Sequence, residues 1–240
     1  MNAMIFAAGL GTRLRPLTND RPKALVEVAG KTLLQHQIEK LKASGFDHIV
    51  VNIHHFGQQI IDFLDKHEHF GIDIRISDER ELLLDTGGGI KAAIKLFDND
   101  EPILIHNVDI ISDIDLRELY ALHHGVATLA INKRETSRYL LFDENNDMKG
   151  WTNIKTGEIK PSSLDKDGLS MFAFSGIHVV DKSIRNYLEN IVEPAFPIMD
   201  FYIKLCQQEQ IHGIDVTGKQ WVDCGKPEHL EKAKDIICSL

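Results

Sequence analysis

FAAGLGTRLRPLTNDRPKAL, residues 6–25, joins an apolar run to a glycine turn and then to a group of basic residues. An apolar run that ends in such a turn is typical of a buried strand followed by a loop. Gly9 and Gly11 have no side chain to keep an anion away, and successive N–H groups in such a turn can form an anion-binding concavity. Arg13 and Lys23 add positive charge. The stretch therefore predicts a phosphate-binding loop, although a glycine turn alone could equally be structural.

The segment GLGTRL also has a superficial similarity to a dinucleotide-binding fingerprint. The third glycine of that fingerprint is replaced by Leu14, and the next apolar run ends in VNIHH, residues 51–55, without an acid for a ribose. The sequence therefore argues against a dinucleotide-dependent dehydrogenase.

The length and composition fit one globular domain. The chain has 240 residues, of which 43% are hydrophobic and 26% are charged, so we expect a single domain over residues 1–240. The early apolar run, residues 3–10, is too short to span a bilayer and follows no basic stretch. Cys206, Cys224 and Cys238 form no metal-type pair and no even disulfide framework, which favours free thiols and a cytoplasmic location.

The charge distribution is uneven along the chain. The formal net charge is -9, which argues against nucleic acid as a partner because such binding usually needs a basic face. Residues 1–31 are nevertheless a basic segment, with five basic residues against Asp20 and Glu27. We expect small anionic substrates, no membrane partner, and a chain that is compatible with a homo-oligomer.

The order of apolar patterns predicts an α/β fold. Strand-like runs alternate with helical patterns in the first half, which is typical of βαβ units on a mainly parallel sheet. The predicted strands are residues 3–8, 48–53, 72–77 and 102–107, and helices are expected over residues 33–41 and 57–67. From about Gly125 shorter strands follow, at 127–132, 138–143 and 171–180, and a helix is expected near 226–237.

The basic stretch resembles the signature of the sugar-1-phosphate nucleotidylyltransferases. The pattern G-x-G-T-R-L-x-P-L-T-x-x-x-P-K-x-L is matched without a gap from Gly9 to Leu25. The resemblance extends to TGGGI at 86–90, NVDI at 107–110, FSGI at 174–177 and WVDCG at 221–225. It implies a Rossmann-like three-layer sandwich with a mixed, mostly parallel central sheet.

The resemblance also implies a reaction. An oxygen of a sugar 1-phosphate attacks the α-phosphorus of a nucleoside triphosphate, and pyrophosphate leaves. Because two anions must meet, such catalysis depends on charge neutralisation and alignment. Arg13 matches the family arginine that holds the β and γ phosphates, and Lys23 matches the lysine near the α-phosphate and the sugar phosphate. The nucleotide-binding positions implied in this chain are Ala8, Gly9, Gly11, Thr12, Arg13, Thr86, Gly87 and Gly88.

Two acids are expected to hold Mg²⁺, the implied cofactor. Asp109 lies just beyond the run that ends at residue 107, where open α/β sheets place their ligands. Asp223, in WVDCG, is the second acid that the family would bring to the metal. Mg²⁺ takes one or two carboxylates together with phosphate oxygens and water. Taken alone, Asp109 could instead be a helix cap and Asp223 a turn residue.

The sugar side of the site is less well defined in the sequence. Ser175 and Gly176 resemble the strand segment of the family that faces the sugar. Many relatives carry Glu-Lys-Pro before that strand, whereas this chain has Lys155 and Lys160 nearby and neither in register. The pairs His54-His55 and His123-His124 could suggest metal ligation, but adjacent residues on a strand point to opposite faces, so we interpret them as surface or half-buried imidazoles.

Several functions remain open. The compact form with GQQI at 57–60 resembles the N-acetylmuramate-1-phosphate uridylyltransferases of cell-wall recycling, which implies UTP as the nucleotide. Mannose- or heptose-1-phosphate guanylyltransferases, which would use GTP, share much of the pattern. A metal-dependent glycosyltransferase would use similar acids, and a non-catalytic regulatory subunit would keep the fold. The P-L-T-x-x-x-P-K segment at 16–23 argues against the glycosyltransferase, and the intact Arg13, Lys23, Asp109 and Asp223 argue against the regulatory subunit.

Overall fold

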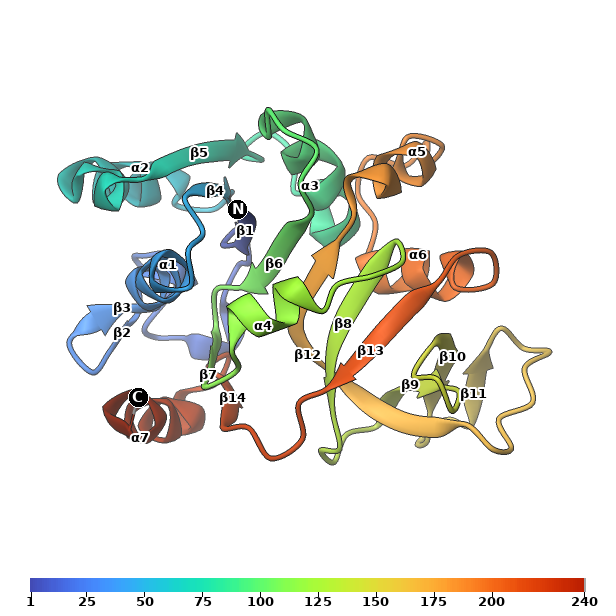
Figure 1. Cartoon of the computed structure of the whole chain (residues 1–240). Helices are drawn as coiled ribbons and strands as arrows, with labels where there is room; N and C mark the ends of the chain where they lie inside the picture. The colour runs from blue at the N-terminus through green and yellow to red at the C-terminus, as the bar shows by residue number, and fades with distance from the viewer. Residues whose placement is uncertain (240) are drawn as a thin grey trace.

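β1 (Asn2–Phe6) has parallel neighbours on both sides, β4 (His48–Ile53) and β6 (Ile103–Asn107), in a computed structural model that describes residues 1–239 (Figure 1). β5 (Asp73–Asp78) extends this parallel set beyond β4. Phe6 is in register with Asn52 on one side and with Asn107 on the other. The carboxyl ends of three buried strands therefore meet at one edge of the sheet, and the loop that follows β1 begins there.

The rest of the ten-stranded sheet is mostly antiparallel. β12 pairs with β6 and carries the added strands in the order β11-β10-β9-β12, while β8 also pairs with β12 and β13 is parallel to β8. These strands are β8 (Ala127–Asn132), β9 (Arg138–Phe142), β10 (Met148–Asn153), β11 (Glu158–Lys160), β12 (Ser170–Val180) and β13 (Ile211–Asp215). Two small antiparallel pairs lie outside it: β2 (Glu27–Val28) with β3 (Lys31–Thr32), and β7 (Ile110–Ser112) with β14 (Trp221–Asp223).

Helices cover both faces of the sheet and give three layers. Side chains of β1 alternate: Ala3 and Ile5 pack in one apolar cluster, and Met4 packs in the other. The first cluster holds buried residues of α1 (Leu33–Ala43), α2 (Gly57–Lys66), α4 (Leu116–Ala121) and α7 (Leu230–Ser239). The second holds those of α3 (Asp85–Ala93), α5 (Arg185–Leu188) and α6 (Ile198–Leu205). The expected Rossmann-like sandwich with a mixed sheet is confirmed.

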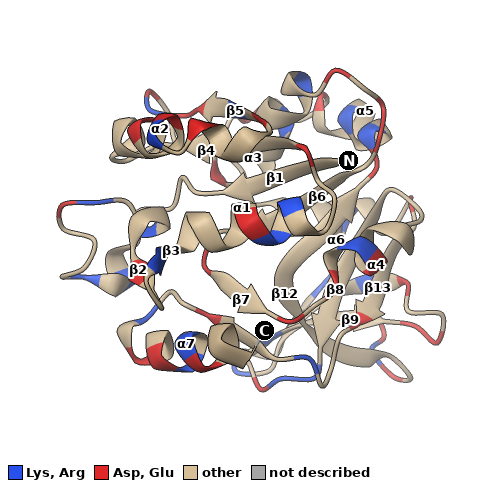
Figure 2. Ribbon diagram, turned by 60° about the vertical axis from the view of Figure 1, so that its left-hand side comes forward, with Lys and Arg blue, Asp and Glu red and all other residues tan. Residues whose placement is uncertain are grey.

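The distribution of charge follows this layering. Figure 2 shows that the strands carry few charged residues and that Lys, Arg, Asp and Glu lie mainly in helices and loops. Uncharged strands fit a sheet that is covered on both faces. Among residues 1–239, no helix combines the length and apolar character needed to cross a bilayer.

One helix begins earlier than the sequence suggests. IKAAIKLF at residues 90–97 has a helical pattern with glycines in front of it, but α3 begins at Asp85 and contains Gly87, Gly88 and Gly89. Glycine disfavours helix interiors, so composition alone would place these glycines outside the helix. The reason for them is packing: a Cβ on Gly88 would lie 2.1 Å from the carbonyl oxygen of Pro194. The segment around Pro194 therefore needs glycine on this face of the helix.

Two histidines are buried in the sheet without charge. The ring of His178 in β12 packs against Phe174 and Tyr202, and neither of its nitrogens has a hydrogen-bond partner within residues 1–239. His106 in β6 has one ring nitrogen bonded to the carbonyl oxygen of Asn107. Burial lowers the pKa of each imidazole to about 3.

We predict that this burial makes the fold sensitive to acid. Between the ordinary histidine pKa of about 6.5 and the folded value of about 3, only the unfolded chain binds the proton, so stability falls as pH falls. Replacing His178→Leu should reduce the slope of unfolding free energy against pH by about 1.4 kcal/mol per pH unit between pH 6 and 4. Urea unfolding at several pH values measures the slope, and the exposed His55→Leu is the control. An unchanged slope in His178→Leu would contradict the prediction.

Candidate functional site

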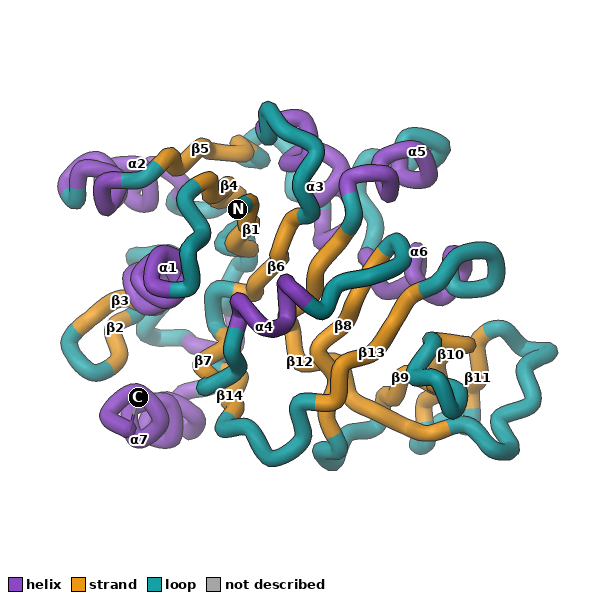
Figure 3. The backbone as a smooth tube through the Cα atoms, viewed as in Figure 1, coloured by secondary structure: helices purple, strands orange, loops and turns teal. Residues whose placement is uncertain are grey.

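A cavity of about 600 Å³ lies at the carboxyl edge of β1, β4 and β6. In Figure 3 the chain leaves these strands as loops, and such an edge is where open α/β sheets bind ligands. The wall combines parts of the basic stretch with residues from five later segments. It is formed by Phe6, Ala8, Gly9, Arg13, Lys23, Asn52, Glu79, Leu83, Asp85, Thr86, Asn107, Asp109, Ile110, Ala195 and Asp223. The structure thus brings seven of the sequence-predicted site residues together.

The two glycines of the basic stretch lie beside Lys23, and Gly11 is the one whose lack of a side chain this contact requires. A Cβ on Gly11 would lie 3.0 Å from Cβ of Lys23, and Gly11 has a φ of +62° that favours glycine. A Cβ on Gly9 would lie 3.6 Å from Nζ of Lys23. The hydroxyl of Thr18 donates to the carbonyl oxygen of Gly11 at 2.8 Å and holds the turn. Neither Gly11 nor the exposed Thr12 is part of the cavity wall.

Lys23 and Asp109 form an ion pair at the bottom of this loop. Nζ of Lys23 lies 2.7 Å from Oδ2 of Asp109, and the two side chains are only 14% and 8% exposed. Burying two charges costs desolvation energy that their attraction offsets only when the geometry is good. The pair therefore fixes the loop against the end of β6 while keeping a cation and an anion at the cavity surface.

The pairing of β14 with β7 brings Asp223 to the same cavity wall as Asp109. It is in register with Ile110 across the β14–β7 pair, and the N–H of Cys224 donates to the carbonyl oxygen of Asp109 at 2.8 Å. Oδ1 of Asp223 accepts from the N–H of Gly225 at 2.7 Å. A Cβ on Gly225 would lie 2.7 Å from Nη2 of Arg13, so the guanidinium of Arg13 packs directly on this turn.

Cys224 directly follows Asp223, but its thiol is not in the deprotonated form that binds a metal ion. Its side chain is fully buried, and burial raises the pKa of the thiol to about 12, with the charges of Asp109 and Asp223 acting in the same direction. The thiol is therefore protonated at neutral pH. Like Cys206 and Cys238, it is free of disulfides.

Asn52 and Glu79 hold the start of the loop and were not identified from the sequence. Oδ1 of Asn52 accepts from the N–H groups of Ala7 at 2.7 Å and Ala8 at 3.2 Å, and Nδ2 donates to Oε1 of Glu79 at 2.7 Å. The other oxygen of Glu79 accepts from the N–H of Leu84 at 3.1 Å. Burial raises the pKa of Glu79, and the bonds from Asn52 and Leu84 oppose this effect. The only signal in the sequence was the position of Asn52 at the end of a predicted strand.

The nucleotide-binding positions predicted at Thr86, Gly87 and Gly88 have different surroundings. Asp85 and Thr86 line the cavity, and Asp85 has a φ of +56°. Gly87 and Gly88 do not line it: the N–H of Gly87 donates to the carbonyl oxygen of Phe196 at 2.8 Å, and Gly88 faces Pro194. These two glycines position the segment that contributes Ala195 to the wall.

The predicted sugar-side pair lies behind the wall. The side chain of Ser175 is fully buried, and its hydroxyl oxygen accepts from Nδ2 of Asn132 at 3.1 Å. Gly176 has a φ of +78°, and a Cβ there would lie 2.9 Å from Nδ2 of Asn107. The structure therefore does not bring the Ser175 hydroxyl to the cavity, and Gly176 supports Asn107, which does line it.

A second cavity of about 420 Å³ is rich in cations. Arg134, Arg138 and Lys160 line it with Trp151, whereas Lys155 is not part of its wall. The guanidinium of Arg134 lies 4.7 Å from the ring centre of Trp221, two residues before Asp223. Burial lowers the pKa of Arg134 and the charge of Asp223 opposes this. Pro197, also on this wall, is two residues from Ala195 on the wall of the first cavity.

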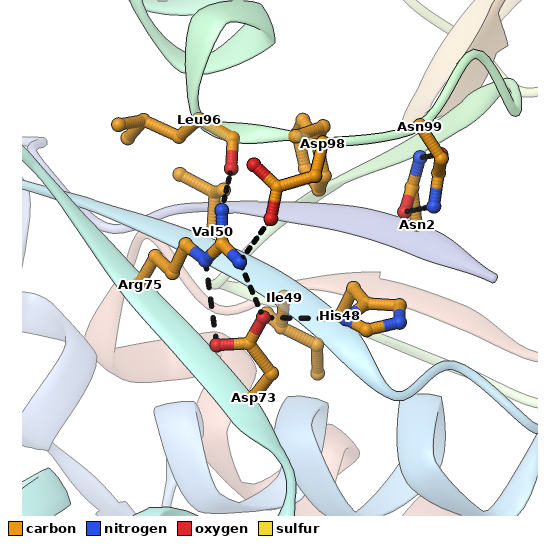
Figure 4. A pocket seen from close by; sticks show the side chains of 10 residues that line it. Asn2, His48, Ile49, Val50, Asp73, Arg75, Leu96, Asp98 and Asn99 are labelled. Carbon is orange, nitrogen blue, oxygen red and sulfur yellow. Dashed lines mark hydrogen bonds and ion pairs between the residues drawn. The ribbon is translucent and has the colours of Figure 1, made fainter.

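A third hollow lies at the opposite edge of the sheet, among residues at the start of β1, β4 and β5 (Figure 4). Arg75 fills it, pairing with Asp98 and with Asp73 and donating to the carbonyl oxygen of Leu96 at 2.6 Å. Only about 30 Å³ remains, the space of about one water molecule. This hollow is a structural ion-pair cluster.

Comparison with known proteins gives one family and a consistent set of relatives. A family model described as nucleotidyl transferase matches residues 2–239. The N-acetylmuramate alpha-1-phosphate uridylyltransferase of Caulobacter vibrioides is 33% identical over 241 residues, covering 94% of this chain and 92% of its own. The mannose-1-phosphate guanyltransferase of Gibberella zeae is also 33% identical, covering 95% of this chain, which spans only 62% of that relative.

Solved structures support the same fold. HddC of Yersinia pseudotuberculosis superposes with a TM-score of 0.78 at 24% identity, covering 98% of this chain and 99% of its own. At that identity the similarity shows the fold alone.

We predict that Asn52→Ala destabilises the fold. The change leaves the N–H groups of Ala7 and Ala8 and the carboxyl group of Glu79 without their buried partner, and each unsatisfied group costs about 1–3 kcal/mol. The free energy of unfolding in urea should fall by about 2 kcal/mol or more. Asn190→Ala removes an exposed amide bonded to Asn186 and is the control, expected to change stability by less than about 0.5 kcal/mol. Equal losses of unfolding free energy in the two variants would show that the hydrogen bonds of Asn52 do not stabilise the fold more than an exposed amide does.

Proposed function

The chain belongs to the nucleotidyl transferase family, and from this membership we propose that it transfers a nucleoside monophosphate from a nucleoside triphosphate to a sugar 1-phosphate. Both curated relatives described above are named for this reaction with particular sugars. The observation that carries the proposal is the shared cavity of Arg13, Lys23, Asp109 and Asp223. Two cations and two acids at one strand edge suit a reaction between two phosphate anions.

The proposed reaction needs alignment rather than a covalent intermediate. A phosphate oxygen of the sugar 1-phosphate attacks the α-phosphorus, the bond to the β-phosphate oxygen breaks, and pyrophosphate leaves. Lys23 stabilises the negative charge that is redistributed about the α-phosphorus, and Arg13 holds the leaving phosphates. The backbone at Ala8 and Gly9 lies on the same wall and lets the phosphates approach.

Asp109 and Asp223 fit the requirements of Mg²⁺, which we propose as the cofactor. Among residues 1–239, Oδ2 of Asp109 has Lys23 as its partner and Oδ1 of Asp223 has Gly225, so each carboxylate keeps one oxygen available. Hard oxygen ligands on one cavity wall are the donor set that Mg²⁺ prefers. When bound, Mg²⁺ supplies positive charge to the phosphates. Asp109 and Asp223 would hold it, and Lys23 would neutralise Asp109 in its absence.

We predict that Asp109→Asn and Asp223→Asn each lower turnover by about 100-fold or more, because each removes a charged ligand and nearly keeps the shape. Asp109→Asn should also lower the free energy of unfolding, since it leaves Lys23 without its buried partner, so turnover is compared at a temperature at which both variants are folded. Pyrophosphate release across a magnesium titration measures the loss, and circular dichroism checks the fold. Asp100→Asn is the control because its side chain is 99% exposed. Near-normal turnover at every magnesium concentration in either variant would overturn the assignment of that residue.

For the sugar, we propose an acidic one, N-acetylmuramic acid 1-phosphate. This sugar carries a lactyl carboxylate in addition to its phosphate, whereas mannose 1-phosphate has no second anion. The basic cavity next to the proposed phosphate site supports the choice. Among the described residues Arg134 and Arg138 have no acidic partner within 4.0 Å, and Nε of Arg134 is buried without a hydrogen-bond acceptor. Guanidinium groups bind carboxylates in a planar, two-bond geometry.

For the nucleotide, we propose UTP, with GTP and mannose or heptose 1-phosphate as the second candidate pair. The uridylyl assignment is supported by the relative whose length this chain nearly matches, and the guanylyl alternative by the longer relative. A base is distinguished by a few hydrogen bonds. The groups available on the wall are the backbone and side chains near Leu83, Asp85 and Thr86.

We predict that the chain prefers UTP with N-acetylmuramic acid 1-phosphate over GTP with mannose 1-phosphate. In addition, Arg138→Ala should lower kcat/KM for N-acetylmuramic acid 1-phosphate by about tenfold or more, because it removes a charge-assisted hydrogen bond. The same variant should leave N-acetylglucosamine 1-phosphate nearly unaffected, since that sugar differs only in lacking the lactyl group. Steady-state pyrophosphate release with each pair gives these ratios.

The matched control is Lys133→Ala, which removes a nearby exposed cation that lies over Phe172 and outside the basic cavity. Equal losses with both sugars in Arg138→Ala would show that the arginine does not read the carboxylate. A preference for the guanosine pair would overturn the uridylyl assignment and leave the reaction class intact.

A further inference from the structure

Three metal-ligating side chains meet at a place that is remote from the cavities described above. His124, Asp147 and His212 each offer one ligand atom, and these atoms all lie within 4.8 Å of one another. His124 follows α4, Asp147 lies in the turn between β9 and β10, and His212 is on β13. The cluster is near the amino ends of β8 and β13, whereas Arg134 follows the carboxyl end of β8.

No pattern in the sequence indicates that these residues meet. His123-His124 was interpreted as a pair on a strand whose members would face opposite ways, but both residues lie in the segment between α4 and β8. Their directions are therefore set by that segment. The hydroxyl of Thr128 donates to the carbonyl oxygen of His124 at 3.1 Å and accepts from its N–H at 3.2 Å, and Thr128 is in register with His212. The Thr128 hydroxyl and the strand register thus bring His124 and His212 together.

We propose that His124, Asp147 and His212 form a binding site for a borderline transition-metal cation, of which Zn²⁺ is the representative. Two neutral imidazoles and one carboxylate are a common zinc ligand set, with water in the fourth position. Ligand atoms about 2.0–2.1 Å from zinc lie about 3.3 Å apart at a tetrahedral centre. Nδ1 of His212 and Oδ1 of Asp147 are 3.2 Å apart, close to this spacing. The rings of His124 and His212 have centroids 4.0 Å apart, so the third ligand is nearby.

The surroundings orient the ligands as a metal site requires. Nδ1 of His124 lies 3.2 Å from the carbonyl oxygen of Leu122; when it donates there, Nε2 keeps its lone pair for a metal. Nε2 of Gln210 donates to both oxygens of Asp147, at 3.0 and 3.1 Å. A hydrogen bond to a ligand's other polar atom, or to a ligating carboxylate, is the usual support of protein metal centres.

A cation here would join three separate segments. The turn of Asp147 is already attached to β13, because the N–H of Gly213 donates to the carbonyl oxygen of Asn146 at 2.8 Å. The segment of His124 is attached to β8 through Thr128. Because metal bound only to the folded chain stabilises it, the site would act as a clamp on the outer part of the sheet.

The test is metal binding by the full-length chain after treatment with a chelator. We expect one equivalent of Co²⁺ to give the visible absorption of a tetrahedral site, and Zn²⁺ to displace it. Zinc at about 100 times its Kd should raise the Tm by about 5 °C. His124→Ala and His212→Ala should each lose the absorption and the shift. Asp147→Asn should weaken binding while leaving both imidazoles in place.

Two controls separate this site from the others. His55→Ala removes an exposed imidazole outside the cluster and should keep the full signal. The double variant Asp109→Asn/Asp223→Asn, which removes the acids proposed for Mg²⁺, should also keep it. The proposal is overturned if both His124→Ala and His212→Ala keep the Co²⁺ spectrum and the zinc-induced rise in Tm. It is also overturned if the unmodified chain gives no tetrahedral Co²⁺ spectrum. Neither result depends on the catalytic proposal.

Discussion

The ion pair between Lys23 and Asp109 is the constraint on which the main cavity depends. It links a loop near the start of the chain to the end of β6, 86 residues later, at 2.7 Å. Both groups are largely removed from water, so neither can lose its partner without leaving a buried charge uncompensated. Gly11 leaves space beside Lys23, because a Cβ there would lie 3.0 Å from Cβ of Lys23. Arg13 lies on the same loop, so the ion pair also helps to hold its guanidinium against the turn that contains Asp223.

Much of this arrangement follows from patterns in the sequence. β1, β4 and β6 are buried on both faces and give continuous apolar runs, so they could be located, whereas β5 at the edge of the sheet gives an alternating run. Once those strands are parallel, Asp109 must lie near the loop after β1 because their carboxyl ends share an edge. The basic stretch supplied the cations. Local signals and one topological rule were therefore enough for the centre of the site.

The parts that escaped prediction depend on contacts between distant segments. Asn52 accepts hydrogen bonds from a loop more than forty residues away, and Glu79 in turn accepts one from Asn52. No spacing in the sequence encodes these contacts. Gly87 and Gly88 have the composition of a loop but lie in a helix, because a segment a hundred residues later needs the space. Ser175 was expected to face the sugar, yet its hydroxyl points into the interior toward Asn132. His124 and His212 are neighbours only because β8 and β13 pair in parallel.

The close contact between α3 and residues 194–196 has a thermodynamic consequence for any ligand. The N–H of Gly87 donates to the carbonyl oxygen of Phe196, and the N–H of Phe196 donates to the carbonyl oxygen of Leu84. This wall of the cavity is thus held by main-chain bonds, which do not depend on the side chain at Ala195. A ligand that binds there loses no free energy to ordering the segment, because folding has already removed that conformational entropy. Substitution of Ala195 would accordingly change the chemistry of the wall, while the position of its backbone stays the same.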